Sequence, residues 1–381
     1  MLFRSALDEC KDEEPSSAIL SILSRYVDRI PNVKFFITGR PEPRIRSGFR
    51  LKSLRPITEV FRLHDVARSS VDQDIKLFFR IQLTDIATSR SDCDFNEDWP
   101  SSSDIDILCA KAAGLFIYAS TVVKFVAFRH RAPTQQLERI ISLPESTIFE
   151  GRAGVDLLYT QILEQAAADV DRVEDDDEIY SHFKTVVGAV LLVHNPLSSR
   201  ALSDLLRLSN ISTTLHSLHS LLLVPETPED PICIFHKSFP DFLMDPNRCK
   251  NEKFLVKPSV HHAEILLSCL RLMKEKLKRN ICNLDDYAIL SEVKGFSTQK
   301  KDHIGDALEY ACQFWTKHLL GVPSDSPCVQ EVQRAIDHLF TKHFMHWIEV
   351  LVLVGNLNVG VHAINDIGQW YTGVSTIQTI Y

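Results

Sequence analysis

Long apolar runs are absent from this 381-residue sequence. No stretch reaches the roughly 18 consecutive apolar residues that a transmembrane helix requires, so no membrane span is expected. The nine cysteines are dispersed and include no C-x-x-C pair. This pattern favours buried thiols in a reducing compartment over disulfides or a zinc site. The first four residues turn polar too quickly to predict a signal peptide, and a cytoplasmic location is therefore expected.

Positive charge is also in short supply. The chain has 42 Lys and Arg against 50 Asp and Glu, a net charge of −8, so it lacks the overall basic surface typical of nucleic-acid-binding proteins. The motifs G-x-S-x-G and H-E-x-x-H and the dinucleotide fingerprint do not occur, which leaves no familiar catalytic constellation. The hydrophobic content of 45% is ample for packed cores, and the length predicts two to four domains.

An apolar, β-rich run at residues 33–38 is the stretch around which the chain is organised. Its composition predicts a strand buried on both faces, which ends at Gly39. Arg40 then lies just beyond the carboxyl end of a central strand, the edge at which open α/β sheets bind ligands. The planar guanidinium of an arginine suits a phosphate. Upstream, Asp8 and Glu9 follow a second predicted strand, and a helix over residues 15–30 joins the two strands.

The segments "ALDEC" (residues 6–10) and "FFITGRPEPRI" (residues 35–45) resemble the Walker B and sensor 1 segments of NACHT-type NTPases of the STAND class, as found in fungal proteins. The resemblance implies that Asp8 and Glu9 handle Mg²⁺ and the attacking water, and that Arg40 senses the γ-phosphate. The alternative is that the two acids form a solvated helix cap and that Arg40 is an ordinary loop cation.

Two departures from the family pattern affect the expected chemistry. Ser5 stands where the family has its Mg²⁺-binding aspartate, and a hydroxyl is a poor replacement for a carboxylate on a hard cation. The phosphate-cradling motif G-x-x-x-x-G-K-[ST] occurs nowhere in these residues. ATP or ADP and Mg²⁺ are therefore expected as cofactors only if such a loop is restored upstream.

Residues 1–64 are interpreted as the truncated NTPase domain, with a last strand over Leu51–Leu63. Residues 65–146 are interpreted as a helical lid, beginning with a helix over Ser69–Leu83. A serine cap at Ser101 starts another helix. The stretch Lys111–Ser120 resembles the "GGLFIYA"-like helix of the NACHT lid, and a single helix is expected there.

Residues 150–247 are interpreted as a winged-helix domain, because three predicted helices precede two short strands over residues 221–224 and 232–235. This region has six Lys and Arg against sixteen Asp and Glu, a balance that opposes DNA binding. Its acidic run Asp169–Glu178 lacks the ligand spacing of a calcium loop and predicts a solvated turn.

The segment "FHKSFPDFL" (residues 235–243) resembles the histidine motif that follows the winged helix of STAND proteins. The resemblance implies that His236 approaches the β-phosphate of ADP. The alternative is a core or capping histidine at a junction between a strand and a helix.

Residues 258–381 are interpreted as a solenoid-like array of helical hairpins. A helix capped by Ser259 runs to Arg279, and further helices are predicted over 302–319, 330–343 and 344–354. Three histidines of this region do not share a helical face, so they are expected to be packed or exposed and not metal ligands: His338, His343 and His346.

The predicted fold is mainly α with a truncated α/β piece: the C-terminal part of a P-loop NTPase domain, a helical lid, a winged helix and a helical-hairpin array. The predicted function is an incomplete NACHT/STAND signalling protein that acts as an interaction or regulatory module without autonomous ATP hydrolysis. One alternative is a nucleotide-dependent signalling ATPase whose P-loop lies upstream; the other is a pure helical interaction scaffold. Protein partners are expected, nucleic acid and membrane partners are not, and the resemblance implies homo-oligomers for the full-length family.

Overall fold

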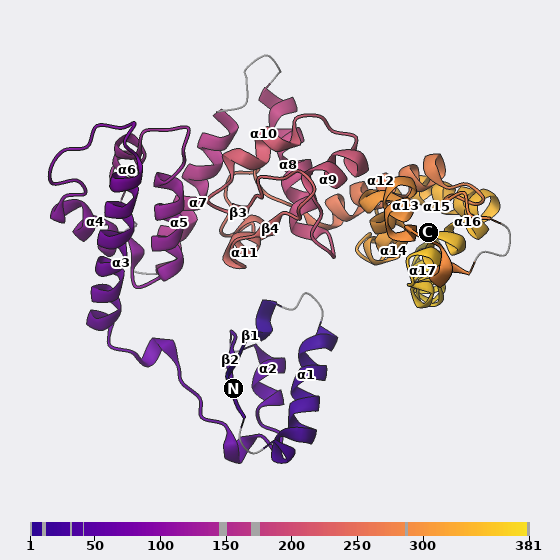
Figure 1. The fold of residues 1–381 in the computed structure, drawn as a ribbon, viewed down its shortest axis with the longest axis horizontal. Helices are drawn as coiled ribbons and strands as arrows, with labels where there is room; N and C mark the ends of the chain where they lie inside the picture. The colour runs from indigo at the N-terminus through magenta and orange to yellow at the C-terminus, as the bar shows by residue number, and fades with distance from the viewer. Residues whose placement is uncertain are drawn as a thin grey trace. The chain divides into compact units, whose positions relative to one another are not determined.

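The computed structural model is mainly α-helical and divides into two compact units, Met1–Val71 and Asp72–Tyr381 (Figure 1). The units are described separately. The structure describes residues 2–9, 13–30, 33–40, 42–144, 151–168, 176–285 and 289–378. None of the helices in these ranges is long and apolar enough to cross a membrane.

The first unit is built on two parallel strands joined by a helix. Its elements are β1 (Leu2–Ala6), α1 (Glu13–Tyr26), β2 (Lys34–Thr38) and α2 (Pro43–Gly48). The strands pair in parallel with Phe3 opposite Phe35. Both helices lie on one side of the pair, where Leu7, Leu20 and Ile45 form a small buried core (Figure 1).

The strand β2 is buried on one face only, so the prediction of a strand buried on both faces is wrong. Exposure alternates along it, with Phe35 and Ile37 half-buried and Phe36 53% exposed. The alternation follows from the period of two in an extended strand, combined with helices on a single side.

The predicted last strand at Leu51–Leu63 is also wrong. This stretch contains the 3-10 turn η3 (Arg55–Ile57) and then extended backbone that pairs with no described strand, up to the 3-10 turn η4 (Leu63–Asp65). A strand needs a neighbour for its backbone hydrogen bonds, and sequence alternation alone does not supply one. Val60 and Phe61 are consequently exposed.

The second unit begins with four helices, and their starts and ends follow local chemistry. They are α3 (Arg68–Ser89), which enters from the first unit, α4 (Ser102–Ala112), α5 (Phe116–Val126) and α6 (Pro133–Ile141). The predicted cap is confirmed, since Ser101 and Asp104 form a reciprocal capping box. The single helix predicted over Lys111–Ser120 is wrong, because Ala113 and Gly114 both have left-handed backbone that ends α4.

The middle of the second unit combines helices with a short hairpin. The elements are α7 (Gly151–Ala168), α8 (Asp176–Leu192), α9 (Ser199–Leu206), α10 (Ile211–Ser217), β3 (Leu222–Leu223), β4 (Cys233–Ile234) and α11 (Ser238–Leu243). The two predicted strands pair antiparallel, and a single bridge from Ser198 to Pro231 extends the pairing. Most of the predicted acidic turn, residues 169–175, lies outside the described residues.

The last part of the chain packs helices around buried tryptophans. The helices are α12 (Pro258–Lys276), α13 (Phe296–His303), α14 (Gly305–Leu320), α15 (Val329–His338), α16 (Phe344–Leu353) and α17 (Leu357–Gln378). Trp315 and Trp347 meet edge to face with ring centroids 5.7 Å apart. The predicted Ser259 cap is wrong, because Pro258 takes the first helical position and Lys257 stands at the N-cap.

A π-helical turn, η6 (Leu339–His343), joins α15 to α16, where the sequence predicted two separate helices. Because a π turn bonds residues five apart, it brings His338 against His343, with ring centroids 5.5 Å apart. Nδ1 of His346 lies 3.4 Å from Nδ1 of His343. The three side chains therefore adjoin one another, contrary to the expectation from regular helical spacing. Among the described residues, no group of three His, Cys, Asp or Glu is arranged to hold a metal ion.

Candidate functional site

Asp8 and Arg40 meet beyond the ends of the two parallel strands. β1 ends at Ala6, and Asp8 lies in the 3-10 turn that follows it. β2 ends at Thr38, and Arg40 comes two residues later. Parallel strands place their carboxyl ends at one edge, and Nε of Arg40 lies 3.6 Å from Oδ2 of Asp8. The sequence prediction that the acid and the arginine share a sheet edge is confirmed.

This ion pair is electrostatically modest. The Arg40 side chain is 39% exposed and the Asp8 side chain 11% exposed, so water screens the attraction and the expected stabilisation is about 0–1 kcal/mol. Gly39 lies against this pair, and a Cβ there would be in ordinary van der Waals contact with Oδ1 of Asp8, at 3.4 Å. A phosphate that approached Arg40 would compete with the Asp8 carboxylate. The side chains of Ser5 and Glu9 lie outside the described residues.

His236 lies at the junction between β4 and α11. The backbone N–H of Ser238 donates to Nδ1 of His236 at 3.1 Å, and the Ser238 hydroxyl lies 2.7 Å from the same nitrogen. Since a backbone N–H can only donate, Nδ1 accepts, and the proton of the neutral ring resides on Nε2. The first of these contacts gives the backbone N–H of the first residue of α11 a hydrogen-bond partner, although the N-cap residue itself is Lys237.

A polar network from α7 fixes the surroundings of His236. The Tyr159 hydroxyl lies 2.7 Å from the Ser238 hydroxyl, and burial raises the pKa of Tyr159 to about 12. Arg248 donates two hydrogen bonds to Asp156, of 3.1 and 2.6 Å, and this carboxylate raises the pKa of the guanidinium. The imidazole is therefore held through Nδ1, which leaves Nε2 as the donor atom of the neutral ring.

The predicted site residues fall into two groups. Asp8 and Arg40 lie together in the first unit, whereas His236 belongs to the second. Sequence order identified the strand ends that carry the first pair. The network around His236 gave no local signal, because Ser238 bonds Tyr159, 79 residues away, and Arg248 bonds Asp156, 92 residues away.

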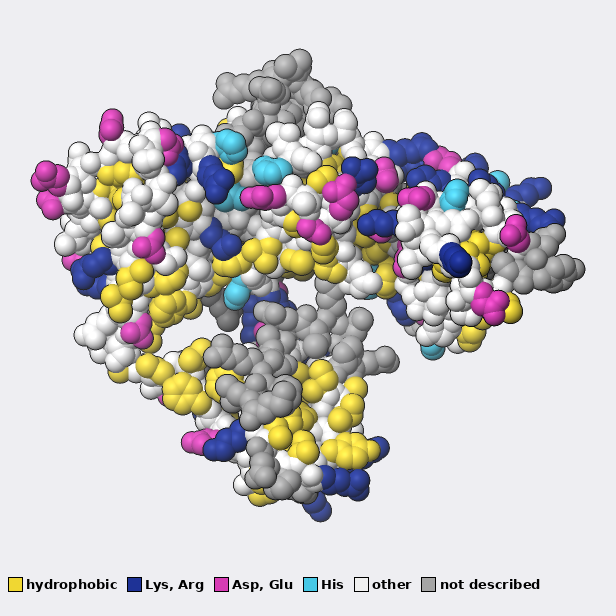
Figure 2. Space-filling model, in the orientation of Figure 1, with side chains coloured by type: hydrophobic (Ala, Val, Ile, Leu, Met, Phe, Trp, Pro, Cys, Tyr) yellow, Lys and Arg dark blue, Asp and Glu magenta, His cyan; other side chains and the backbone are white. Residues whose placement is uncertain are grey.

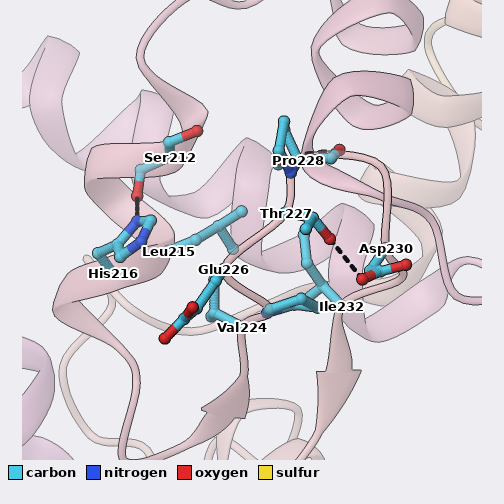
Figure 3. A pocket seen from close by; sticks show the side chains of 11 residues that line it. Ser212, Leu215, His216, Val224, Glu226, Thr227, Pro228, Asp230 and Ile232 are labelled. Atoms are coloured by element: carbon cyan, nitrogen blue, oxygen red, sulfur yellow. Dashed lines mark hydrogen bonds between the residues drawn. The ribbon is translucent and has the colours of Figure 1, made fainter.

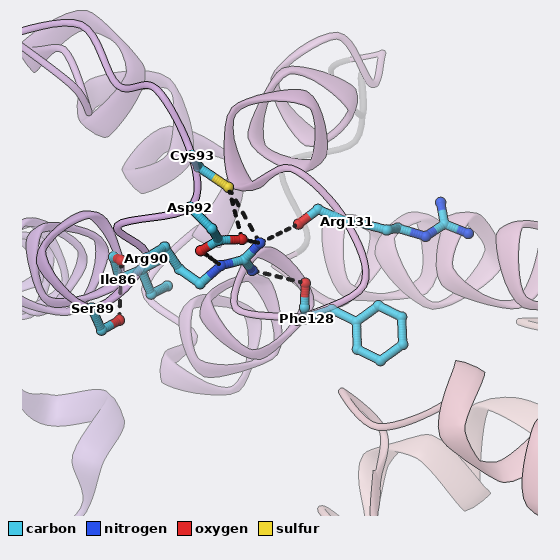
Figure 4. A network of polar contacts seen from close by, with 7 residues as sticks. All are labelled: Ile86, Ser89, Arg90, Asp92, Cys93, Phe128 and Arg131. Atoms are coloured by element: carbon cyan, nitrogen blue, oxygen red, sulfur yellow. Dashed lines mark hydrogen bonds and ion pairs between the residues drawn. The ribbon is translucent and has the colours of Figure 1, made fainter.

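A second polar cluster, centred on Arg90, was not predicted (Figure 4). The guanidinium donates to both carboxylate oxygens of Asp92 at 2.8 and 2.9 Å, and to the backbone oxygens of Phe128 and Arg131 at 3.4 Å. The bond from Arg90 lowers the pKa of Asp92 to about 2. Because the donors already serve the protein, this cluster is a clamp between the end of α3 and the loop after α5.

A histidine pair in the second unit, one member fully buried and the other half-buried, also escaped prediction. Nδ1 of His318 lies 2.9 Å from Nδ1 of His262, and Nε2 of His318 lies 2.6 Å from the Tyr310 hydroxyl. His318 is fully buried. Burial lowers the pKa of His262, and the charge of His261 lowers it further. The pair joins α12 to α14 and was invisible in the sequence because its members are 56 residues apart.

The second unit has two hollows, and only one of them is large enough for a ligand. The first lies between α10 and the hairpin turn, beside Ser212, His216 and Glu226 (Figure 3). Its volume of about 60 Å³ is far below the roughly 300 Å³ of small ligand pockets, so it has room only for water. Its acidic rim, with Glu226 and Asp230, also opposes an anion.

The second hollow, of about 420 Å³, is large enough for a ligand but has mixed charge. It lies between α8 and the start of α12. Its charged side chains are Lys184, Lys253, Lys257, Glu252 and Glu264. Nζ of Lys184 donates to the backbone oxygen of Glu252, and Lys253 lies over the ring of Tyr180. Because the carboxylates offset much of the lysine charge, the lining selects no single class of ligand.

Comparisons with known proteins returned no relatives. No protein-family model matches the sequence, and neither a curated protein nor a solved structure matches it. The resemblance to NACHT-type NTPases therefore rests on the sequence segments and remains a prediction.

Proposed function

We propose that this chain is a NACHT-type STAND signalling protein that works as an interaction or regulatory module without autonomous ATP hydrolysis. The pairing of Asp8 with Arg40 beyond two parallel strands carries the proposal. In an α/β sheet, that edge is where a nucleotide-handling site would lie. The order of strand, helix, strand and arginine is the order of the Walker B and sensor 1 segments.

The finer domain assignment belongs to the same proposal. We assign residues 1–64 to the C-terminal part of a P-loop NTPase domain and residues 65–146 to a helical lid. The α8–α10 helices with the β3–β4 hairpin would form a winged helix, followed directly by His236. Residues 258–381 would form the helical array that offers surface to protein partners.

The absence of hydrolysis follows from the chemistry of the strand edge. Ser5 takes the position at which the family binds Mg²⁺ through a carboxylate, and no phosphate-cradling loop occurs among these 381 residues. The Asp8 carboxylate is engaged by Arg40. Without the metal ligand and the lysine of that loop, little stabilises the charge that develops during phosphoryl transfer.

The test is phosphate release by the purified chain with ATP and Mg²⁺, compared with a mock preparation. We expect the two rates to agree. Hydrolysis above the mock level that disappears in Asp8→Asn would overturn the proposal. Arg46→Ala, an exposed arginine of the same unit, serves as the matched control, with circular dichroism to verify folding.

A pure helical scaffold is the second candidate, and the contacts of His236 with Ser238 favour it. The two candidates differ in nucleotide binding. A retained switch site binds fluorescent ADP in a titration, and Arg40→Ala or His236→Ala, each tested in its own right, weakens the binding if that residue contacts the nucleotide. A scaffold binds no ADP in any of these proteins.

A further inference from the structure

The chain-wide charge conceals two units of opposite sign. Residues 1–71 have 13 Lys and Arg against 9 Asp and Glu, a net charge of +4. Residues 72–381 have 29 against 41, a net charge of −12. Within the first unit, residues 46–63 hold five basic side chains and one acid, Glu59. These 18 residues are named the basic–apolar segment. Charge asymmetry of this kind indicates an anionic partner for the basic part.

The cations of the basic–apolar segment are not neutralised by neighbouring carboxylates. Arg40 and Arg44, which precede the segment, pair with Asp8 and Glu42. The five that follow are exposed and form no ion pair within the described part of the chain: Arg46, Arg50, Lys52, Arg55 and Arg62. Figure 2 shows Lys and Arg side chains along the lower margin of this unit, with hydrophobic side chains beside them.

Bulky apolar side chains alternate with these cations and are also exposed. Phe61 is 76% and Leu63 is 80% exposed, and three others are more than two-fifths exposed: Leu51, Ile57 and Val60. Single exposed apolar residues are ordinary, but a run of them beside a charge cluster marks an interaction surface. The segment begins in the last turn of α2 and continues through the 3-10 turn η3 into extended backbone. Leu54 is buried and the Ser53 hydroxyl lies 2.6 Å from that of Ser24 on α1, whereas residues 59–63 are all exposed.

We propose that the basic–apolar segment binds the surface of an anionic lipid bilayer. The five cations would meet the lipid headgroups, while Val60, Phe61 and Leu63 would enter the boundary between headgroups and acyl chains. This combination of basic residues with adjacent bulky apolar ones is the physical signature of interfacial membrane binding. It revises the expectation of no membrane partner, which rested on the average charge and on the lack of a spanning run.

The apolar side chains decide against nucleic acid. Phosphate contacts would use the cations alone and leave most of the aliphatic surface in water, and a single aromatic, Phe61, offers one stacking platform. A lipid surface accepts both kinds of side chain at once and demands no fixed register from extended backbone. Membrane binding by this segment does not depend on the nucleotide chemistry of the proposed function.

The full chain is tested by sedimentation with vesicles of phosphatidylcholine, with and without phosphatidylserine. We expect binding only with phosphatidylserine, and weaker binding at high salt because surface charges are screened. R50Q/K52Q/R55Q removes three cations. Each cation should raise the membrane partition coefficient about fivefold, so the triple variant should lower it about a hundredfold. V60S/F61S/L63S should also weaken binding while the remaining binding stays salt-dependent.

The matched control is K274Q/K276Q/K278Q, three exposed lysines at and just beyond the end of α12, where the apolar residue between them in sequence, Leu277, is buried. This variant should bind vesicles as the unmodified chain does. Equal loss in the control, or no binding to phosphatidylserine, overturns the proposal. So does binding to duplex DNA that depends on the three cations but ignores the apolar substitutions. Self-association without lipid that R50Q/K52Q/R55Q abolishes would instead identify the acidic unit of a second copy as the partner.

Discussion

At the scale of single residues, the pair of His262 and His318 couples stability to pH. His318 is fully buried and His262 half-buried, and burial lowers the pKa of His262. Below pH ~6.5, the ordinary histidine value, the unfolded chain takes up a proton that the folded chain accepts only at lower pH. The free energy of unfolding should therefore fall as the pH drops from about 6.5 through the lowered pKa.

Substitution of His262 by Asn should flatten this pH dependence. The amide can keep one hydrogen bond toward His318 but has no proton to gain. Each unit by which the pKa is lowered corresponds to about 1.4 kcal/mol of the free energy of unfolding, so the variant should lose less stability between neutral and mildly acidic pH. Denaturant midpoints from tryptophan fluorescence, which report on buried Trp315 and Trp347, give the measurement.

His303→Asn, at an exposed histidine, is the control and should keep the slope of the unmodified protein. Some slope should also remain in His262→Asn, because burial lowers the pKa of His219 as well. Identical slopes in all three proteins would show that the pKa of His262 does not differ between the folded and unfolded states.

The sequence located Asp8 and Arg40 because both follow strand ends, and strand ends are readable from local composition. It could not reveal the network around His236, because Ser238 is linked to Tyr159 on α7, 79 residues away. The same limit applies to Arg90, whose partners include backbone oxygens about 40 residues further along. Side-chain networks depend on tertiary packing that no window of sequence contains.

At the scale of elements, the capping box of α4 should contribute measurably to the second unit. Ser101→Ala removes the hydroxyl that accepts from the backbone N–H of Asp104, and loss of such a cap costs about 1 kcal/mol. Ser103→Ala, in the first turn but exposed and without a capping role, should cost much less. Thermal unfolding followed by circular dichroism compares the two, and equal shifts would contradict the role of the cap.

Helical periodicity predicted most helices, while departures from regular geometry were missed. The predicted helix at Ser69–Leu83 lies within α3, with Ile75, Phe79 and Leu83 buried as its spacing requires. The sequence did not predict that α4 ends at Ala113. A helix end with left-handed backbone is usually signalled by glycine, and alanine rarely adopts that backbone. The segment 51–63 has the alternation of a strand but no partner, and pairing is a property of the sheet.

At the scale of the whole molecule, the two units should unfold separately. We expect a chain that lacks residues 1–63 to give a cooperative, mainly helical transition and a higher soluble yield. The deletion removes the open face around Phe36 and the exposed Phe61, both of which invite aggregation. The full and shortened chains are compared by soluble yield and circular dichroism melts. An unfolded short chain beside a cooperative full chain would show that the first unit is integral to the second.

The π turn between α15 and α16 makes the orientation of α16 sensitive to the number of residues in residues 339–343. A π turn amounts to one extra residue in an otherwise regular helix, and each residue of an α-helix turns the chain by about 100°. The side chains of α15, before Leu339, keep their directions. Those of α16, after the π turn, are rotated about the helix axis by about 100°. Trp347 meets Trp315, and its indole N–H reaches the backbone oxygen of Cys312 at 2.9 Å, only with this rotation in place. A one-residue gap within residues 339–343 would thus redirect the whole buried face of α16 while leaving its composition unchanged.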